Sequence, residues 1–194
     1  VYEEFPDLNA YVAIISSRLH SVSEMSNQPF TFSLLDSDMV NAFAIPGGYV
    51  YVTRGLMALA NSEAELAGVI GHEIGHVIAR HGAQRMTQQA LAGLGVAVVG
   101  IALQDRNRMN MAVAGAMAWI TGYSSRQELA SDELGVRYLT RAGYDPFSMA
   151  SFLEQLERQS QLARQFAFQD NEPDPANSWF ATHPRTQDRG VAAA

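Results

Sequence analysis

The sequence predicts one α+β domain over residues 1–194 that is mostly helical, with a small antiparallel sheet near its N-terminal end. Three observations predict this class. The segments with strand-like alternation all lie between residues 30 and 53. Helical periodicity dominates the remaining chain. The length of 194 residues and the 47% hydrophobic content suit a single domain with a sizeable core.

Composition and charge exclude several classes of function. The net charge of −7 argues against a nucleic-acid partner. The chain has no cysteine, which excludes a thiol nucleophile, thiolate metal ligands and disulfides. It begins at Val1 without a signal peptide, so we expect any targeting or membrane segment to lie upstream.

The first elements follow from local patterns. Residues 7–22 carry apolar side chains at helical spacing and predict an amphipathic helix. Alternation predicts strands at residues 30–34, 41–45 and 49–53. The turn Pro46-Gly47-Gly48 joins the last two strands, so we expect an antiparallel sheet before the next helix.

A buried helix is predicted over residues 62–82. Ser62 and Glu65 form a capping box at its start, and apolar residues surround it. Three glycines form a stripe along this helix, namely Gly68, Gly71 and Gly75. The stripe predicts that another element approaches the helix closely. The alternatives are that helix dimerisation or chance placed the glycines there.

This helix carries the motif His72-Glu73-Ile74-Gly75-His76. Residues i and i+4 of a helix lie about 40° apart, so His72 and His76 can reach one metal ion. Glu73 lies beside them, where a carboxylate can accept a proton from metal-activated water. These are the parts of a zinc peptidase. The alternative is two buried helix histidines without a metal.

Catalytic zinc usually has three protein ligands, and the third here is a later histidine or a carboxylate. Glu128 is the best candidate, because Asp132 shares its helix face and can accept a hydrogen bond from a ligand histidine. The alternatives are a capping box of Ser125 with Glu128 and a surface ion pair for Asp132. His81 lies across a continuous helix from His72, so we expect it to be structural.

Two apolar stretches follow the motif, at residues 90–103 and 111–122. Fourteen residues of helix span about 21 Å, which is too short to cross a bilayer. We expect two buried helices, with a mobile or membrane-touching hairpin over residues 90–121 beside the cleft as the alternative. Helices are then predicted at residues 125–141 and 146–168.

Together these motifs resemble the zinc endopeptidases related to the CAAX-prenyl protease and the heat-shock protease HtpX, in particular their soluble periplasmic members. The resemblance covers four blocks, which are residues 41–56, residues 71–76, Ser125–Glu128 with Asp132 and Gly135, and Thr182-His183-Pro184 with Arg189. The long membrane spans of the integral members are missing, so prenyl-peptide processing is not expected.

The resemblance implies a gluzincin-type fold with one Zn²⁺ ion on His72, His76 and Glu128, and Glu73 as general base. It implies that the segment Asn41-Ala42-Phe43-Ala44 forms an edge strand along the cleft, where an extended substrate adds as a further strand. Arg189 would contribute to substrate binding.

His183 has three interpretations. Its segment, Thr182-His183-Pro184, is typical of a helix start, which gives His183 a structural role. If the family's placement over the cleft holds, His183 either donates to the developing oxyanion or occupies the open zinc position and holds the enzyme latent.

These observations predict a zinc-dependent endopeptidase that cleaves extended proteins or peptides. The alternative is a catalytically silent chaperone or scaffold with the same fold. The expected partners are protein substrates and, peripherally, a membrane. Family resemblance alone suggests the bacterial periplasm or cell envelope, and quality control of envelope proteins.

Overall fold

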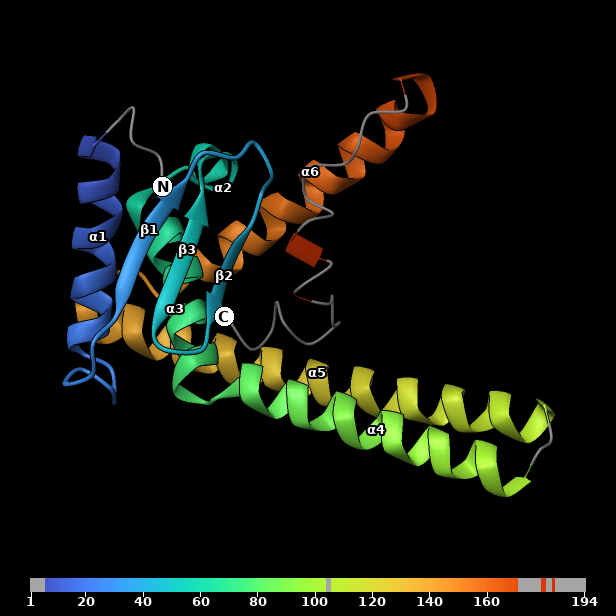
Figure 1. Cartoon of the computed structure of the whole chain (residues 1–194). Coiled ribbons are helices and arrows are strands. Elements are labelled where there is room, and N and C mark those ends of the chain that lie inside the picture. Colours follow the sequence, from blue (N-terminus) through green and yellow to red (C-terminus); the bar gives the residue numbers. More distant parts are fainter. Residues whose placement is uncertain (1–5, 104–105, 171–178, 181–182, 184–194) are drawn as a thin grey trace.

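Helices dominate this computed structural model, which describes residues 6–103, 106–170, 179–180 and 183 (Figure 1). The elements in chain order are α1 (Pro6–Ser21), β1 (Thr31–Leu35), β2 (Ala42–Ile45), β3 (Tyr49–Thr53), α2 (Arg54–Leu59), α3 (Glu63–Ile78), α4 (His81–Leu103), α5 (Arg106–Ala142) and α6 (Ser148–Asp170). The predicted class, a mostly helical α+β fold with a small sheet before the motif helix, is confirmed.

The sheet is mixed, whereas the sequence predicted a wholly antiparallel one. Its strand order is β1-β3-β2. The turn through Gly47 and Gly48, both with positive φ, makes β2 and β3 antiparallel as expected. However, β3 lies between the other two strands, and it pairs with β1 in parallel. Alternation identifies a strand but does not identify its neighbours, so the prediction was wrong on this point.

The core lies between the sheet, α1, α3, the second half of α5, and α6. Fully buried side chains from each of these elements meet there, for example Ile15, Leu34, Ile70, Leu139 and Leu156. α3 is central, and its residues from Glu65 to His76 are all buried. Because α3 is surrounded by other elements, its polar side chains are shielded from water and must form hydrogen bonds with other protein groups.

The ends of α3 are set by local hydrogen bonds. Ser62 caps its start by accepting from the Glu65 N–H, as predicted, while the Glu65 carboxylate accepts from the Asn61 N–H. The helix ends at Ile78 and not at residue 82. Arg80 has a left-handed backbone with φ of 56°, so α4 sets off from His81 in a new direction.

The glycine stripe allows neighbouring helices to approach the backbone of α3. A Cβ atom on Gly71 would lie 3.3 Å from the Cα of Gly135 in α5. One on Gly75 would lie 3.2 Å from the carbonyl oxygen of Ser131, and Gly68 approaches α6 as closely. The interpretation of the stripe as a site of close approach is therefore confirmed.

α5 is one unbroken helix from Arg106 to Ala142, where the sequence predicted two shorter segments. It ends at Gly143, whose φ is +79°. Ser125 consequently lies inside the helix and has no free N-terminus to cap. This excludes the capping-box alternative for Glu128.

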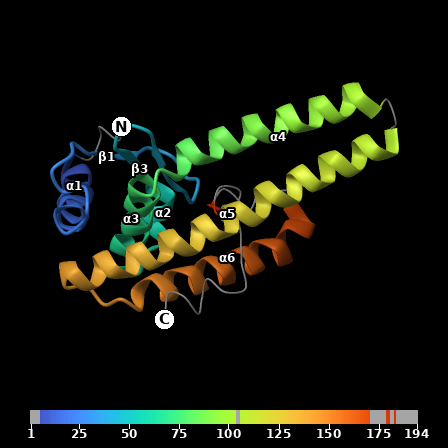
Figure 2. The same cartoon turned by 90° about the horizontal axis from the view of Figure 1, so that it is seen from below.

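α4 and the first half of α5 form a hairpin that projects away from the sheet (Figures 1 and 2). We call residues 81–124 the helical arm. The prediction of two buried helices is wrong, because large apolar side chains of the arm are exposed, including Leu94 (64%), Val98 (64%), Met111 (74%) and Met117 (60%). None of the helices, over their described residues, has the length and hydropathy needed to cross a membrane.

Candidate metal centre

The two motif histidines point toward one another from consecutive turns of α3. Both are buried, and their Nε2 atoms are 2.9 Å apart. The rings meet almost edge to face, with an angle of 76° between their planes. Two imidazole nitrogens at this distance can share a proton or a metal ion.

Glu128 reaches the same point from α5. Its Oε2 lies 3.4 Å from His72 Nε2, and its Oε1 lies 3.3 Å from His76 Nε2. The close approach of the two helices makes this possible: a Cβ on Gly135 would lie 3.0 Å from the backbone nitrogen of His72. The three residues that were expected to bind zinc are therefore brought together.

His183 lies at the same point, although it is 55 residues beyond Glu128. Its Nδ1 is 3.0 Å from Glu128 Oε2 and 3.3 Å from His72 Nε2, while its Nε2 is 3.4 Å from Glu73 Oε1. The imidazole of His183 therefore lies at the metal cluster, as both functional interpretations of His183 required.

Contacts with Trp179, four residues earlier in the chain, position His183. Its N–H donates to the carbonyl oxygen of Trp179, 2.8 Å away, and its ring stacks on the buried Trp179 ring with 4.1 Å between centroids. Trp179 thus holds the imidazole in place. Thr182, Pro184 and Arg189 lie outside the described residues.

The arrangement of donors fits zinc. One donor atom from each of His72, His76, Glu128 and His183 lies within 4.8 Å of all the others. The measured pairs are separated by 2.9 to 3.4 Å. Two donors at 2.0–2.1 Å from a tetrahedral zinc ion are about 3.3 Å apart. Three imidazoles and one carboxylate are also ligands that zinc accepts.

Buried carboxylates give the cluster a preference for positive charge. Asp132 Oδ1 lies 2.8 Å from His72 Nδ1, and both side chains are fully buried. Burial lowers the pKa of His72, but Asp132 and Glu128 outweigh burial and raise this pKa to about 9. Burial would raise the pKa of Glu128, but hydrogen bonds from the three histidines hold it well below its usual range. The negative charges of Asp132 and Glu128 stabilise a proton on His72, and they attract a bound metal cation by the same electrostatic interaction.

His81 makes a contact that the sequence did not reveal. Its Nδ1 lies 3.0 Å from Nδ1 of His76 and 3.1 Å from Oγ of Ser131. Burial lowers the pKa of His81 to about 4, so the ring is neutral and can accept a hydrogen bond from His76. The turn at Arg80 brings it there, and a continuous helix would not have done so.

β2 is an edge strand, because it pairs with β3 alone in the described sheet. The Thr53 N–H donates to the carbonyl oxygen of Asn41, which makes these two residues a hydrogen-bonded pair. Such pairs alternate with non-bonded pairs in antiparallel sheets. The main-chain groups of Ala42 and Ala44 are therefore directed toward the free edge, while those of Phe43 face β3.

Comparison with known proteins identifies the family. Residues 6–193 match the model of Peptidase family M48. The chain is 37% identical to the beta-barrel assembly-enhancing protease of Yersinia pestis over 164 residues, which are 80% of this chain and 34% of that protein. It is 32% identical to the protein of the same name from Escherichia coli K12 over 167 residues, 81% of this chain and 34% of that protein.

A eukaryotic relative is more distant. The mitochondrial metalloendopeptidase OMA1 of Schizosaccharomyces pombe is 25% identical over 164 residues, which are 84% of this chain and 48% of that protein. The chain spans about a third of the length of the two bacterial relatives. The predicted resemblance is confirmed, and the chain belongs to Peptidase family M48.

Proposed function

We propose that this chain is a zinc-dependent endopeptidase in which His72, His76 and Glu128 hold the metal ion. The buried cluster of donors beside Glu73 is the observation that carries the proposal. It favours an enzyme over a silent scaffold, because each group that hydrolysis needs is present in one place. Identification of new N-termini in an unfolded protein incubated with the zinc-loaded chain tests it, with Glu73→Gln as the control.

Zinc, when bound, supplies Lewis acidity to the scissile carbonyl and to a water molecule. Glu73 is the base: its buried carboxylate accepts a proton as the water oxygen attacks the carbonyl carbon. The same proton is then delivered to the amide nitrogen as the C–N bond breaks. Asp132 and His81 fix the rings of His72 and His76 through their Nδ1 atoms, and such outer contacts sustain metal affinity.

We infer that an extended substrate adds to the free edge of β2 along Asn41–Ala44. The outward direction of the main-chain groups of Ala42 and Ala44 supports this, because a peptide backbone can pair with them. Side-chain identity would then matter less than the presence of the N–H and C=O groups.

Proline at Ala44 should therefore weaken the binding of long peptides. It removes one N–H donor, and one lost hydrogen bond of about 1 kcal/mol raises the KM about fivefold. Ala44→Ser keeps the donor and serves as the control. Steady-state kinetics with peptides of increasing length would measure the effect. If Ala44→Pro folds, binds zinc and keeps its KM for long peptides, the substrate does not pair with β2.

His183 is proposed to be a fourth ligand that keeps the enzyme latent. The position of its Nδ1 among the donors supports this over a role at the oxyanion. His183→Ala should then raise the initial rate of peptide cleavage while zinc is retained. A fall in kcat of about 100-fold or more would instead support an oxyanion role, and unchanged kinetics would leave only a structural one.

We propose that the helical arm makes peripheral contact with a membrane. Its large apolar side chains are exposed, whereas the small Ala92, Ala112 and Ala116 are partly buried. This distribution is typical of helices that pack in lipid. The chain should float with liposomes, and the double change Leu94→Glu with Val98→Glu should release it. Wild-type protein that stays at the bottom of the gradient would contradict this proposal.

We propose that the protein acts in the bacterial cell envelope. Two relatives are named for enhancing beta-barrel assembly, which supports protein quality control as the biological task. Cell fractionation of the native host, with detection of the full-length protein in periplasm or membranes, tests the location. Its appearance in the cytoplasm alone would overturn it.

A further inference from the structure

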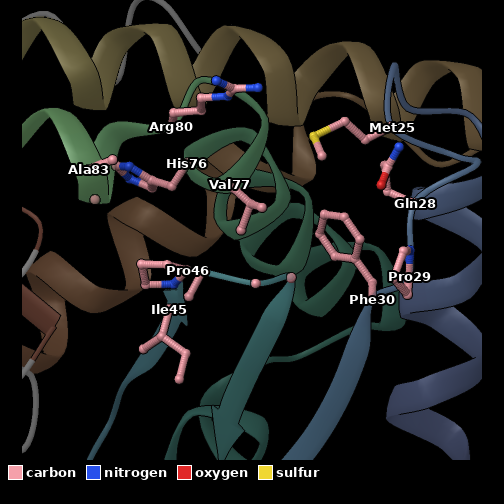
Figure 3. Close-up of a pocket in the computed structure, with 14 residues that line it drawn as sticks. Met25, Gln28, Pro29, Phe30, Ile45, Pro46, His76, Val77, Arg80 and Ala83 are labelled. Atoms are coloured by element: carbon pink, nitrogen blue, oxygen red, sulfur yellow. The ribbon is translucent and has the colours of Figure 1, made fainter.

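A cavity of about 360 Å³ opens directly beside the metal cluster (Figure 3). Three segments enclose it: the connection between α1 and β1, the end of β2 with its turn into β3, and the junction of α3 with α4. His76 lines it, so the cavity and the cluster share a wall. None of the roles given above uses this space.

The lining of the cavity is mostly apolar, and its polar side chains are those of Gln28, His76 and Arg80. Figure 3 shows Phe30 and Met25 on the side of the cavity opposite His76. Val77 lies between His76 and these two residues, and Ile45 and Pro46 lie below. Apart from His76, these side chains are apolar, and the residues that line the cavity include no carboxylate. The one charged group is the guanidinium of the exposed Arg80. Such a space suits a large aliphatic or aromatic side chain and repels a cationic one.

The position of the cavity relates it to a substrate on β2. Ala44 lines the cavity and also directs its main-chain groups toward the free edge of the sheet. A peptide paired with that edge runs past Ala44, and alternate side chains of the peptide lie on the same face as the cavity. Because His76 forms its wall, the residue that enters it must be close to the bond that is cleaved.

We propose that this cavity binds an apolar side chain of the substrate at one fixed position within two residues of the scissile bond, and thereby sets the cleavage preference. The inference rests on the proposed endopeptidase function and adds its specificity. Arg80 contributes by excluding lysine and arginine. The left-handed turn at Arg80 also places the first residues of α4 against the cavity.

Gly82 offers a way to close the cavity without disturbing the core. It is exposed, and a Cβ atom there would meet only the Pro46 ring, at 4.0 Å. Gly82→Leu should therefore fold and fill the opening between α4 and Pro46. Gly93→Leu is the matched control, because it makes the same change in α4 at a position with open space around it. Ile45→Glu, at a half-exposed wall position, should reverse the charge preference.

The test is cleavage of a mixed peptide library by the zinc-loaded chain, with product termini read by mass spectrometry. Wild type and Gly93→Leu should enrich Leu, Met or Phe at one position near the cut. Gly82→Leu should lose that enrichment and cut a Phe-containing peptide about 10-fold or more slowly than wild type. It should cut the matching Ala-containing peptide at the wild-type rate, and Ile45→Glu should admit Lys or Arg.

A second readout separates this inference from the proposed activity. Binding of the same Phe and Ala peptides is measured in the inactive Glu73→Gln background, with and without Gly82→Leu. Tighter binding of the Phe peptide that disappears with Gly82→Leu supports the cavity even if no turnover is seen. Cleavage without apolar enrichment, or equal profiles and equal binding for Gly82→Leu and wild type, overturns it.

Discussion

Replacing Glu73 with glutamine should abolish peptide cleavage and leave zinc binding intact. Glu73 is not among the four donors that face one another, so zinc loses no ligand. The amide has nearly the same shape as the carboxylate but cannot accept the proton from water. General-base catalysis contributes about 100- to 10,000-fold to a rate, and kcat/KM should fall by at least the lower figure.

The matched control is Glu63→Gln, an isosteric change in the first turn of the same helix, away from the donors. Cleavage of a fluorogenic peptide and zinc content by elemental analysis should be measured on the same preparations. Glu63→Gln should match wild type in both. Near-normal turnover by Glu73→Gln would show that another group is the base.

Replacing Glu128 with glutamine should remove zinc as well as activity. Its carboxylate contacts all three histidines of the cluster and is fully buried. The change deletes the negative charge that attracts the cation, in a place where water cannot replace it. The loss of zinc affinity should exceed the 10- to 100-fold that is about usual for an outer contact.

Glu133→Gln is the control for this change, because it is the same substitution on the same helix at an exposed position. Competition with a chelator would give both affinities. If Glu128→Gln keeps the wild-type affinity, the third ligand is a different residue, and His183 becomes the first candidate because of its Nδ1 position.

The sequence was sufficient wherever a local pattern determines the structure. Helix periodicity puts His72 and His76 together, and the cap at Ser62 starts their helix. The spacing of Glu128 and Asp132 predicted that both would face one site, and each contacts His72. The glycines of α3 required close neighbours, which are α5 for Gly71 and Gly75 and α6 for Gly68.

The features that were missed depend on a backbone turn and on tertiary contacts that no periodic pattern in the sequence indicates. Nothing local indicates that Arg80 adopts a left-handed backbone, so the contact of His81 with His76 could not be foreseen. His183 meets Glu128, 55 residues away in the chain, only through tertiary packing. The helical arm was also mispredicted, because an apolar stretch has the same sequence pattern whether it lies in a protein core or on an exposed interaction surface.

The most direct test of the proposed metal centre is anomalous diffraction at the zinc absorption edge from crystals of the wild-type chain. One strong peak should lie between Nε2 of His72, Nε2 of His76 and the Glu128 carboxylate, at about 2.0–2.2 Å from each. In the latent state the same peak should also contact Nδ1 of His183. Zinc-loaded crystals with no peak between these atoms, or with their zinc bound at another set of side chains, would contradict the account.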